Sequence, residues 1–224
     1  MLKLQEGASI VIISLIIAFA ITLVETPAYF FYTLLSVFLI ISINTIAKKV
    51  AAYYAESEVE VKIWQLERWG LIGILLSEGF FHPSREFKRP FPIGAFLPIV
   101  SKILLFPVAN FVWLGSLIFD VKTKIYKAAK RHNITFSFSE ITDYQIGLIA
   151  SAGILANLTI AVIAYLIGIP PEMNFAKLSA FYVFFNMLPL SNLDGNKIFF
   201  GNKIIWYTLE GLALVGVGYA IFLP

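Results

Sequence analysis

Long apolar runs, each about the length of a membrane crossing, recur along the 224-residue chain. A transmembrane helix needs roughly 20 mainly apolar residues, because the hydrocarbon core offers no water to backbone polar groups. The composition agrees, since 59% of the residues are hydrophobic and only 14% are charged, whereas soluble domains carry roughly 25% charged residues. We therefore predict an all-α polytopic protein of the cell membrane, with a single integral membrane domain over residues 1–224.

Five apolar segments are expected to form helices in this domain. They cover residues 8–24, 28–55, 145–167, 175–188 and 204–223. The first lacks a small-residue cleavage site after it, so we expect a retained anchor rather than a secretory signal.

The segment from residue 69 to 117 is harder to interpret. Residues 69–81 are apolar but short, and residues 91–115 are interrupted by three prolines and carry Lys102. Basic stretches lie on both sides of the segment, and short basic loops favour the cytoplasm. We therefore prefer a proline-broken re-entrant loop or tight hairpin over one kinked span. This gives about six crossings in total and a cytoplasmic N-terminus.

Two stretches have a different pattern. Residues 59–64 alternate apolar and charged side chains, which indicates a small β element with one buried face. Residues 120–144 are polar and are expected to be partly helical, with Ser139 and Glu140 near a helix start.

Composition also limits cofactors and partners. The chain has no Cys, so a zinc site would need His, Asp or Glu, and the two histidines, His82 and His132, both lie in expected loops far apart in the sequence. We expect both to be surface or interfacial residues. The net charge of +3 suits anionic lipid headgroups, and no basic run is interleaved with stacking aromatics, so no nucleic-acid partner is expected.

A polar motif at the end of an apolar run is the strongest functional signal. Asn186, Pro189, Asp194 and Gly195 lie within ten residues. Pro189 is expected to break a helix in its middle, and an ionisable group at such a place in a membrane protein is a functional-site hypothesis. The alternative is an ordinary helix end followed by an Asp-Gly turn near the headgroups.

This motif resembles the third-helix motif of the site-2 protease type of intramembrane zinc metalloprotease. Residues 153–157, Gly-Ile-Leu-Ala-Asn, resemble the preceding Gly-Pro-x-x-Asn segment of that family, with Asn157 as its amide. Residues 44–49, Asn-Thr-Ile-Ala-Lys-Lys, stand where an archaeal branch has His-Glu-Leu-Ala-His-Lys. The resemblance covers about residues 40–206 and implies a site-2 protease-like core.

The positions at which this chain differs from the resembling family are those that would bind zinc and activate water. In an HExxH helix two imidazoles bind zinc and the Glu acts as general base on the metal-bound water. The matching residues here are Asn44, Thr45 and Lys48. Of the ligands that the resemblance implies only Asp194 is present, and one carboxylate does not hold catalytic zinc. No cofactor is expected.

Lys48 offers a replacement for the metal. If the backbone of the resembling family is kept, its ammonium lies near the lost ion and faces Asp194, with Asn44 or Asn157 as possible hydrogen-bond donors. The alternative is that Lys48 extends to the headgroups beside Lys49.

Three functions follow from these observations. The first is a non-catalytic relative, a pseudoprotease, that binds transmembrane or extended segments of partner proteins, for example by strand addition to residues 59–64. The second is an active intramembrane zinc metalloprotease with ligands from unexpected positions. The third is a small transporter or channel, suggested by Asn157, Asn186 and Asp194 near broken helices. The oligomeric state is left open.

Overall fold

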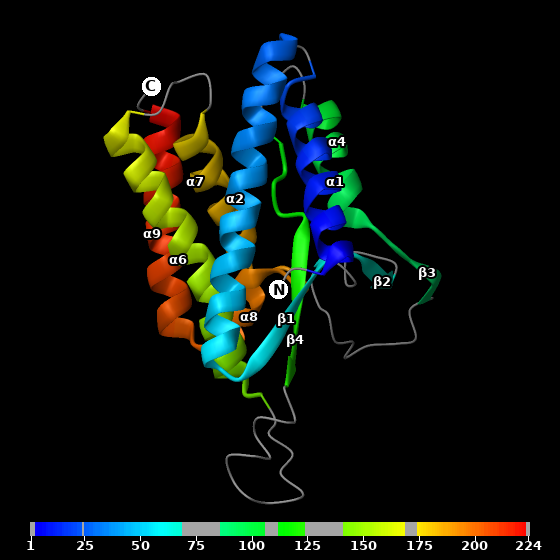
Figure 1. Ribbon diagram of the computed structural model, residues 1–224, viewed down its shortest axis with the longest axis vertical. Helices are drawn as coiled ribbons and strands as arrows, with labels where there is room; N and C mark the ends of the chain where they lie inside the picture. Colours follow the sequence, from blue (N-terminus) through cyan, green and yellow to red (C-terminus); the bar gives the residue numbers. More distant parts are fainter. Residues whose placement is uncertain are drawn as a thin grey trace, which may run out of the picture.

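Helices make up most of the structure, which is a computed structural model describing residues 3–23, 25–68, 86–105, 112–123, 141–168 and 174–222. Figure 1 shows the elements in chain order along the colour bar. They are α1 (Leu4–Ile21), α2 (Pro27–Tyr54), β1 (Ser57–Ile63), β2 (Leu66–Arg68), β3 (Glu86–Phe91), α4 (Ile93–Leu105), β4 (Leu117–Thr123), α6 (Asp143–Ile167), α7 (Phe175–Met187), α8 (Asp194–Gly201) and α9 (Lys203–Phe222).

Four of the described helices, α1, α2, α6 and α9, are long and apolar enough to cross a membrane. Large apolar side chains on their outer faces are exposed, among them Phe31 on α2 and Val215 on α9, which is consistent with contact to lipid. The prediction of a mostly helical membrane protein is thereby confirmed. Helix α7 has only 13 residues, about 20 Å, so the expected total of about six crossings stays a prediction.

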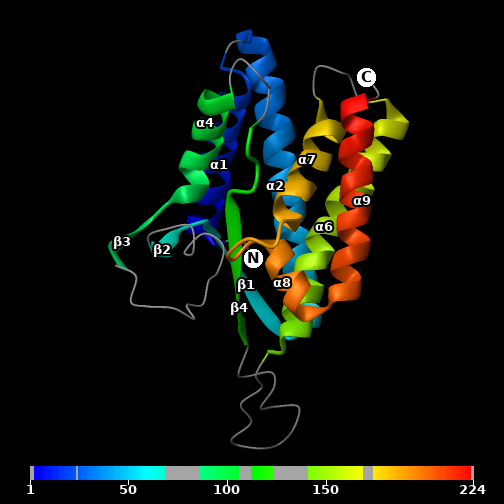
Figure 2. The same ribbon diagram turned by 180° about the vertical axis from the view of Figure 1, so that it is seen from behind.

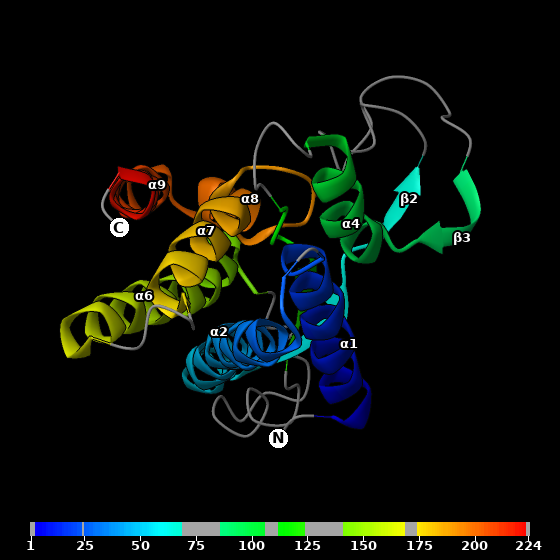
Figure 3. The same cartoon turned by 90° about the horizontal axis from the view of Figure 1, so that it is seen from above.

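Helix α2 lies at the centre of the bundle. It packs against α1 on one side and against α6 and α7 on the other, while α1 also packs against α4. The view from above shows α2 between these two groups (Figure 3). Residues on α2 can therefore meet residues from most of the other helices.

A short antiparallel ribbon of β1 and β4 runs through the same region (Figure 2). Val59 and Val61 of β1 and Phe119 of β4 are buried, so one apolar face packs on the helices, as the alternation over residues 59–64 predicts. The strand β1 spans residues 57–63. Its partner is β4, so residues 120–123, at the start of the segment expected to be partly helical, belong to a strand, while residues 124–140 of that segment lie outside the described residues. From Phe119 onward, apolar residues alternate with the exposed Asp120 and Lys122, a period of two that suits a strand, while Ile118 is buried as well.

Around Trp64 the chain leaves strand β1, and the segment just before strand β4 returns to the same place. Trp64 donates its backbone N–H to Ser116 O and accepts at its carbonyl from Gly94 N–H, both at 2.9 Å. Residues 94 and 116 therefore lie side by side, and a Cβ on Gly94 would lie 2.2 Å from Ser116 O. Helix α4, with Pro98 inside it, thus begins beside residue 116, and the re-entrant loop or tight hairpin expected for residues 69–117 stays a prediction. Residues 69–81, His82, His132, Ser139 and Glu140 lie outside the described residues.

Pro189 does not lie inside a helix, contrary to expectation. Helix α7 ends at Met187, and Leu188 has an extended conformation with φ −59° and ψ 131°. The residue before a proline is driven out of the helical region by the proline ring, so the helix ends one residue earlier than the apolar pattern suggests. Asp194 is correspondingly the first residue of a further helix, α8, and not the end of an apolar one.

Candidate functional site

A buried lysine and a buried aspartate meet at the centre of the bundle. The ammonium nitrogen of Lys48 lies 2.6 Å from Oδ2 of Asp194, and the two side chains are 6% and 0% exposed. Lys48 therefore does not extend to the headgroups. Its helix, α2, also buries Asn44 and Thr45, because residues four apart share a helix face. The structure thus brings together Asp194 and the three residues at the HExxH-like positions.

Glycine at two positions allows this approach. A Cβ on Gly153 of α6 would lie 2.8 Å from both Asn44 Nδ2 and Lys48 Cε, so a larger residue would displace these two side chains or separate α6 from α2. A Cβ on Gly195 would lie 1.9 Å from Met187 O, so only glycine lets the start of α8 pack on the end of α7. Gly153 therefore allows the close contact of α6 with α2 beside the lysine–aspartate site, and Gly195 allows the close contact of α8 with α7.

The hydrogen bonds expected around the pair are not formed. Neither Asp194 oxygen has a hydrogen bond of good geometry within the described part of the chain, and Asn44 Nδ2 and Asn157 Nδ2 donate none there. Asn186 donates instead to the Tyr182 carbonyl at 2.8 Å. The expectation that Asn44 or Asn157 donates to Asp194 is therefore wrong. Asp194 is stabilised by the ammonium and by its place at the N-terminus of α8, where the helix dipole favours an anion.

A small cavity borders the site. Its volume is about 10 Å³, close to the space that one water molecule needs. The cavity is lined by side chains of α2, β1, β4 and α7, namely Asn44, Thr45, Lys48, Val61, Leu117, Ile118, Phe119 and Tyr182. A cavity of this size cannot accept a substrate, so the described site is closed.

A second lysine, Lys197, belongs to the same cluster. The Phe119 ring lies 4.7 Å from Lys48 Nζ and 3.8 Å from Lys197 Nζ, and Lys197 also donates to the Phe119 carbonyl. Burial lowers the pKa of Lys197 to about 8, although nearby Asp194 opposes the shift. The ammonium groups of Lys48 and Lys197 therefore both lie against the ring of Phe119, and Lys48 also contacts Asp194.

These groups do not fit a zinc ion. An ammonium has no lone pair to offer, and the Asp194 oxygen that a metal would need is occupied by Lys48 at 2.6 Å. Within the ranges that the structure covers, no three His, Asp or Glu side chains come together. Asp120 lies apart from the cluster, in an exposed ion pair with Lys62 at 2.7 Å.

Comparison with known proteins adds no identification, since no family model, no curated protein and no solved structure matches the chain.

Three residues of the cluster could not be selected from the sequence. Lys197 lies three residues after Asp194 and shares its helix face, but this spacing has meaning only once α8 is known to exist. Phe119 comes from β4, which was not expected to be a strand. Tyr182 is one aromatic residue among many in an apolar run.

Proposed function

We propose that the chain is a non-catalytic relative of the site-2 protease type of intramembrane metalloprotease, a pseudoprotease that binds membrane partners without cutting them. The observation that carries the proposal is the contact of 2.6 Å between Lys48 Nζ and Asp194 Oδ2 in a fully buried position. In the resembling family the corresponding residues converge on a cation. Here a lysine supplies the positive charge, and the carboxylate remains neutralised without a metal.

The chemistry that hydrolysis requires has no carrier in this cluster. A metalloprotease activates water with an open metal position and a general base. Thr45 stands where the resemblance places the base, and a threonine hydroxyl does not accept a proton near neutral pH. Lys48 is engaged by Asp194. The cluster therefore serves as a structural centre of the bundle.

Binding rather than turnover is supported by two surfaces. The apolar outer faces of α2, α6 and α9 suit the bilayer and transmembrane helices of a partner. The ribbon of β1 and β4 offers a strand edge for an extended segment.

Restoring the motif tests the proposal. The triple variant Asn44→His, Thr45→Glu, Lys48→His should bind about one zinc ion per chain, because two imidazoles and Asp194 then form a three-ligand site. Adding Asp194→Ala to this variant should abolish binding, and wild-type protein prepared in parallel should bind none.

Elemental analysis after size-exclusion chromatography provides the measurement, and a fluorogenic transmembrane substrate reports any cleavage. A folded triple variant that binds no zinc would argue that the helices do not carry the family's geometry. Zinc-dependent cleavage by the wild type would overturn the proposal outright.

A further inference from the structure

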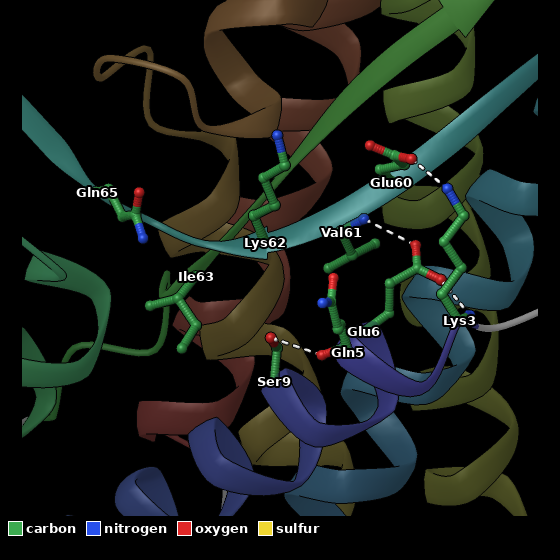
Figure 4. A pocket seen from close by; sticks show the side chains of 9 residues that line it. All are labelled: Lys3, Gln5, Glu6, Ser9, Glu60, Val61, Lys62, Ile63 and Gln65. Carbon is green, nitrogen blue, oxygen red and sulfur yellow. Dashed lines mark hydrogen bonds and ion pairs between the residues drawn. The ribbon is translucent and has the colours of Figure 1, made fainter. Parts of the chain in front are cut away.

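The N-terminal turn of α1 lies on the outer edge of β1, where Glu6 contacts the strand backbone and the neighbouring Lys3 pairs with Glu60 (Figure 4). Glu6 is 4% exposed. Its Oε1 accepts from the Val61 backbone N–H at 3.0 Å and from Lys49 Nζ at 2.9 Å. Its Oε2 accepts from the Lys3 backbone N–H at 2.7 Å and again from Lys49 at 2.9 Å. This carboxylate has a full set of donors.

Glu6 and Lys49 together cover the positions where another strand would bind. Val61 stands opposite Phe119 of β4, yet its N–H points away from β4, toward Glu6. Lys49 donates to the Val59 carbonyl on the same edge, at 3.1 Å. One side chain therefore accepts from the edge and the other donates to it, as a neighbouring backbone would.

A pocket of about 280 Å³ continues this edge beyond Glu6. It follows β1 toward Gln65 and is bordered on its other side by the first turns of α1 (Figure 4). Backbone direction alternates along an antiparallel strand, so the N–H and C=O of Ile63 face the same side as those of Val61. The pocket is lined by Lys3, Gln5, Glu6, Ser9, Glu60, Val61, Lys62, Ile63 and Gln65.

We propose that Glu6 and Lys49 form a displaceable plug, and that the occupant of this edge is an extended segment of a partner polypeptide. The segment first pairs with the backbone of Ile63 in the pocket. When Glu6 moves away, the segment also pairs with the backbone of Val61 and Val59. This inference rests on the proposed partner-binding function and adds its regulation. The lining favours a polypeptide over a lipid phosphate, because its two lysines, Lys3 and Lys62, are balanced by Glu6 and Glu60, and because the backbone N–H and C=O of Ile63 face it as those of a strand edge do.

Amide hydrogen exchange tests the plug without a partner. In lipid nanodiscs, Glu6→Ala should speed exchange at Val61 at least tenfold, and Glu6→Gln, which keeps an acceptor but loses the charge, should have an intermediate effect. Asp120→Asn is the matched control, because Asp120 pairs with Lys62 of the same ribbon but neither lines the pocket nor accepts from the backbone of this edge, and exchange at Val61 should stay at the wild-type rate. Unchanged exchange at Val61 in both folded Glu6 variants overturns the plug.

A labelled peptide with the β4 sequence, residues 117–123, serves as the extended probe, since it already matches the alternation of β1. Glu6→Ala should bind it at least tenfold more tightly than the wild type and Asp120→Asn do. Faster exchange without tighter peptide binding overturns the strand-binding role of the edge. Both readouts are independent of zinc content, so they can fail while the non-catalytic assignment stands, or hold while it fails.

Discussion

At the scale of single residues, the structure depends on two charges buried together. A carboxylate inside a membrane bundle is costly alone and tolerable when paired. Lys48 supplies that pair to Asp194, but the incomplete hydrogen bonding of the carboxylate indicates that much of the desolvation cost is not recovered. A buried ion pair of this kind is weak evidence that the pair stabilises the fold, and stronger evidence that the positions of its two side chains are constrained.

Removing one partner should therefore cost more than removing both. Lys48→Ala leaves Asp194 buried and unpaired and should destabilise the protein by about 3–5 kcal/mol, whereas Lys48→Met combined with Asp194→Leu should be close to neutral. Lys62→Ala, which breaks an exposed pair with Asp120, should cost at most about 1 kcal/mol. Denaturant or thermal unfolding in mild detergent gives the comparison. Equal losses for Lys48→Ala and the double variant would contradict the account.

Lys197 makes stability depend on pH. Its pKa is lowered to about 8 in the folded protein from 10.5 when exposed. Between these values the unfolded chain binds more protons than the folded one, so the contribution of Lys197 to stability rises with pH from about 8 to 10.5. Unfolding midpoints measured from pH 7 to 10.5 should rise more steeply in the wild type than in Lys197→Met. Parallel profiles would show that Lys197 is not desolvated.

At the scale of elements, close helix contact depends on glycine. Gly153→Ala should force α6 from α2, because its Cβ would lie 2.8 Å from Lys48 Cε, with a loss of about 1–3 kcal/mol. Gly211→Ala on α9 is the matched control, since nothing lies within 4 Å of its added Cβ, and should be neutral or stabilising by up to about 1 kcal/mol. Unfolding of the two variants under one condition compares them, and a Gly153→Ala protein as stable as the control would rule out tight packing there.

The longer helices could be predicted from the sequence, and the short elements could not. Apolar runs placed α2, α6, α7 and α9 to within two residues at either end, because burial and lipid contact both require the same uninterrupted pattern. Helix α8 has eight residues, too few for periodicity to identify. Strand β4 is defined by pairing with β1, about 60 residues earlier in the chain, and local pattern carries little of that information.

At the scale of the whole molecule, helix α2 contributes residues both to the lysine–aspartate site and to the edge of β1. Its buried face carries Asn44, Thr45 and Lys48 toward α6 and α8, while Lys49, the next residue, points to Glu6 of α1 and the edge of β1. Asp194 could be selected from the sequence because an ionisable residue close to an apolar run is unusual in a membrane protein. The Glu6 contact could not, because it joins residues 43 positions apart.

The central claim is that a lysine replaces a metal beside Asp194. The most direct measurement is the metal content of the wild-type protein, purified in mild detergent, incubated with zinc and freed of excess by size-exclusion chromatography, with Asp194→Ala in parallel. The account predicts less than about 0.1 zinc per chain in both, because an ammonium 2.6 Å from the carboxylate excludes a second cation. One zinc per chain in the wild type, absent from Asp194→Ala, would contradict it.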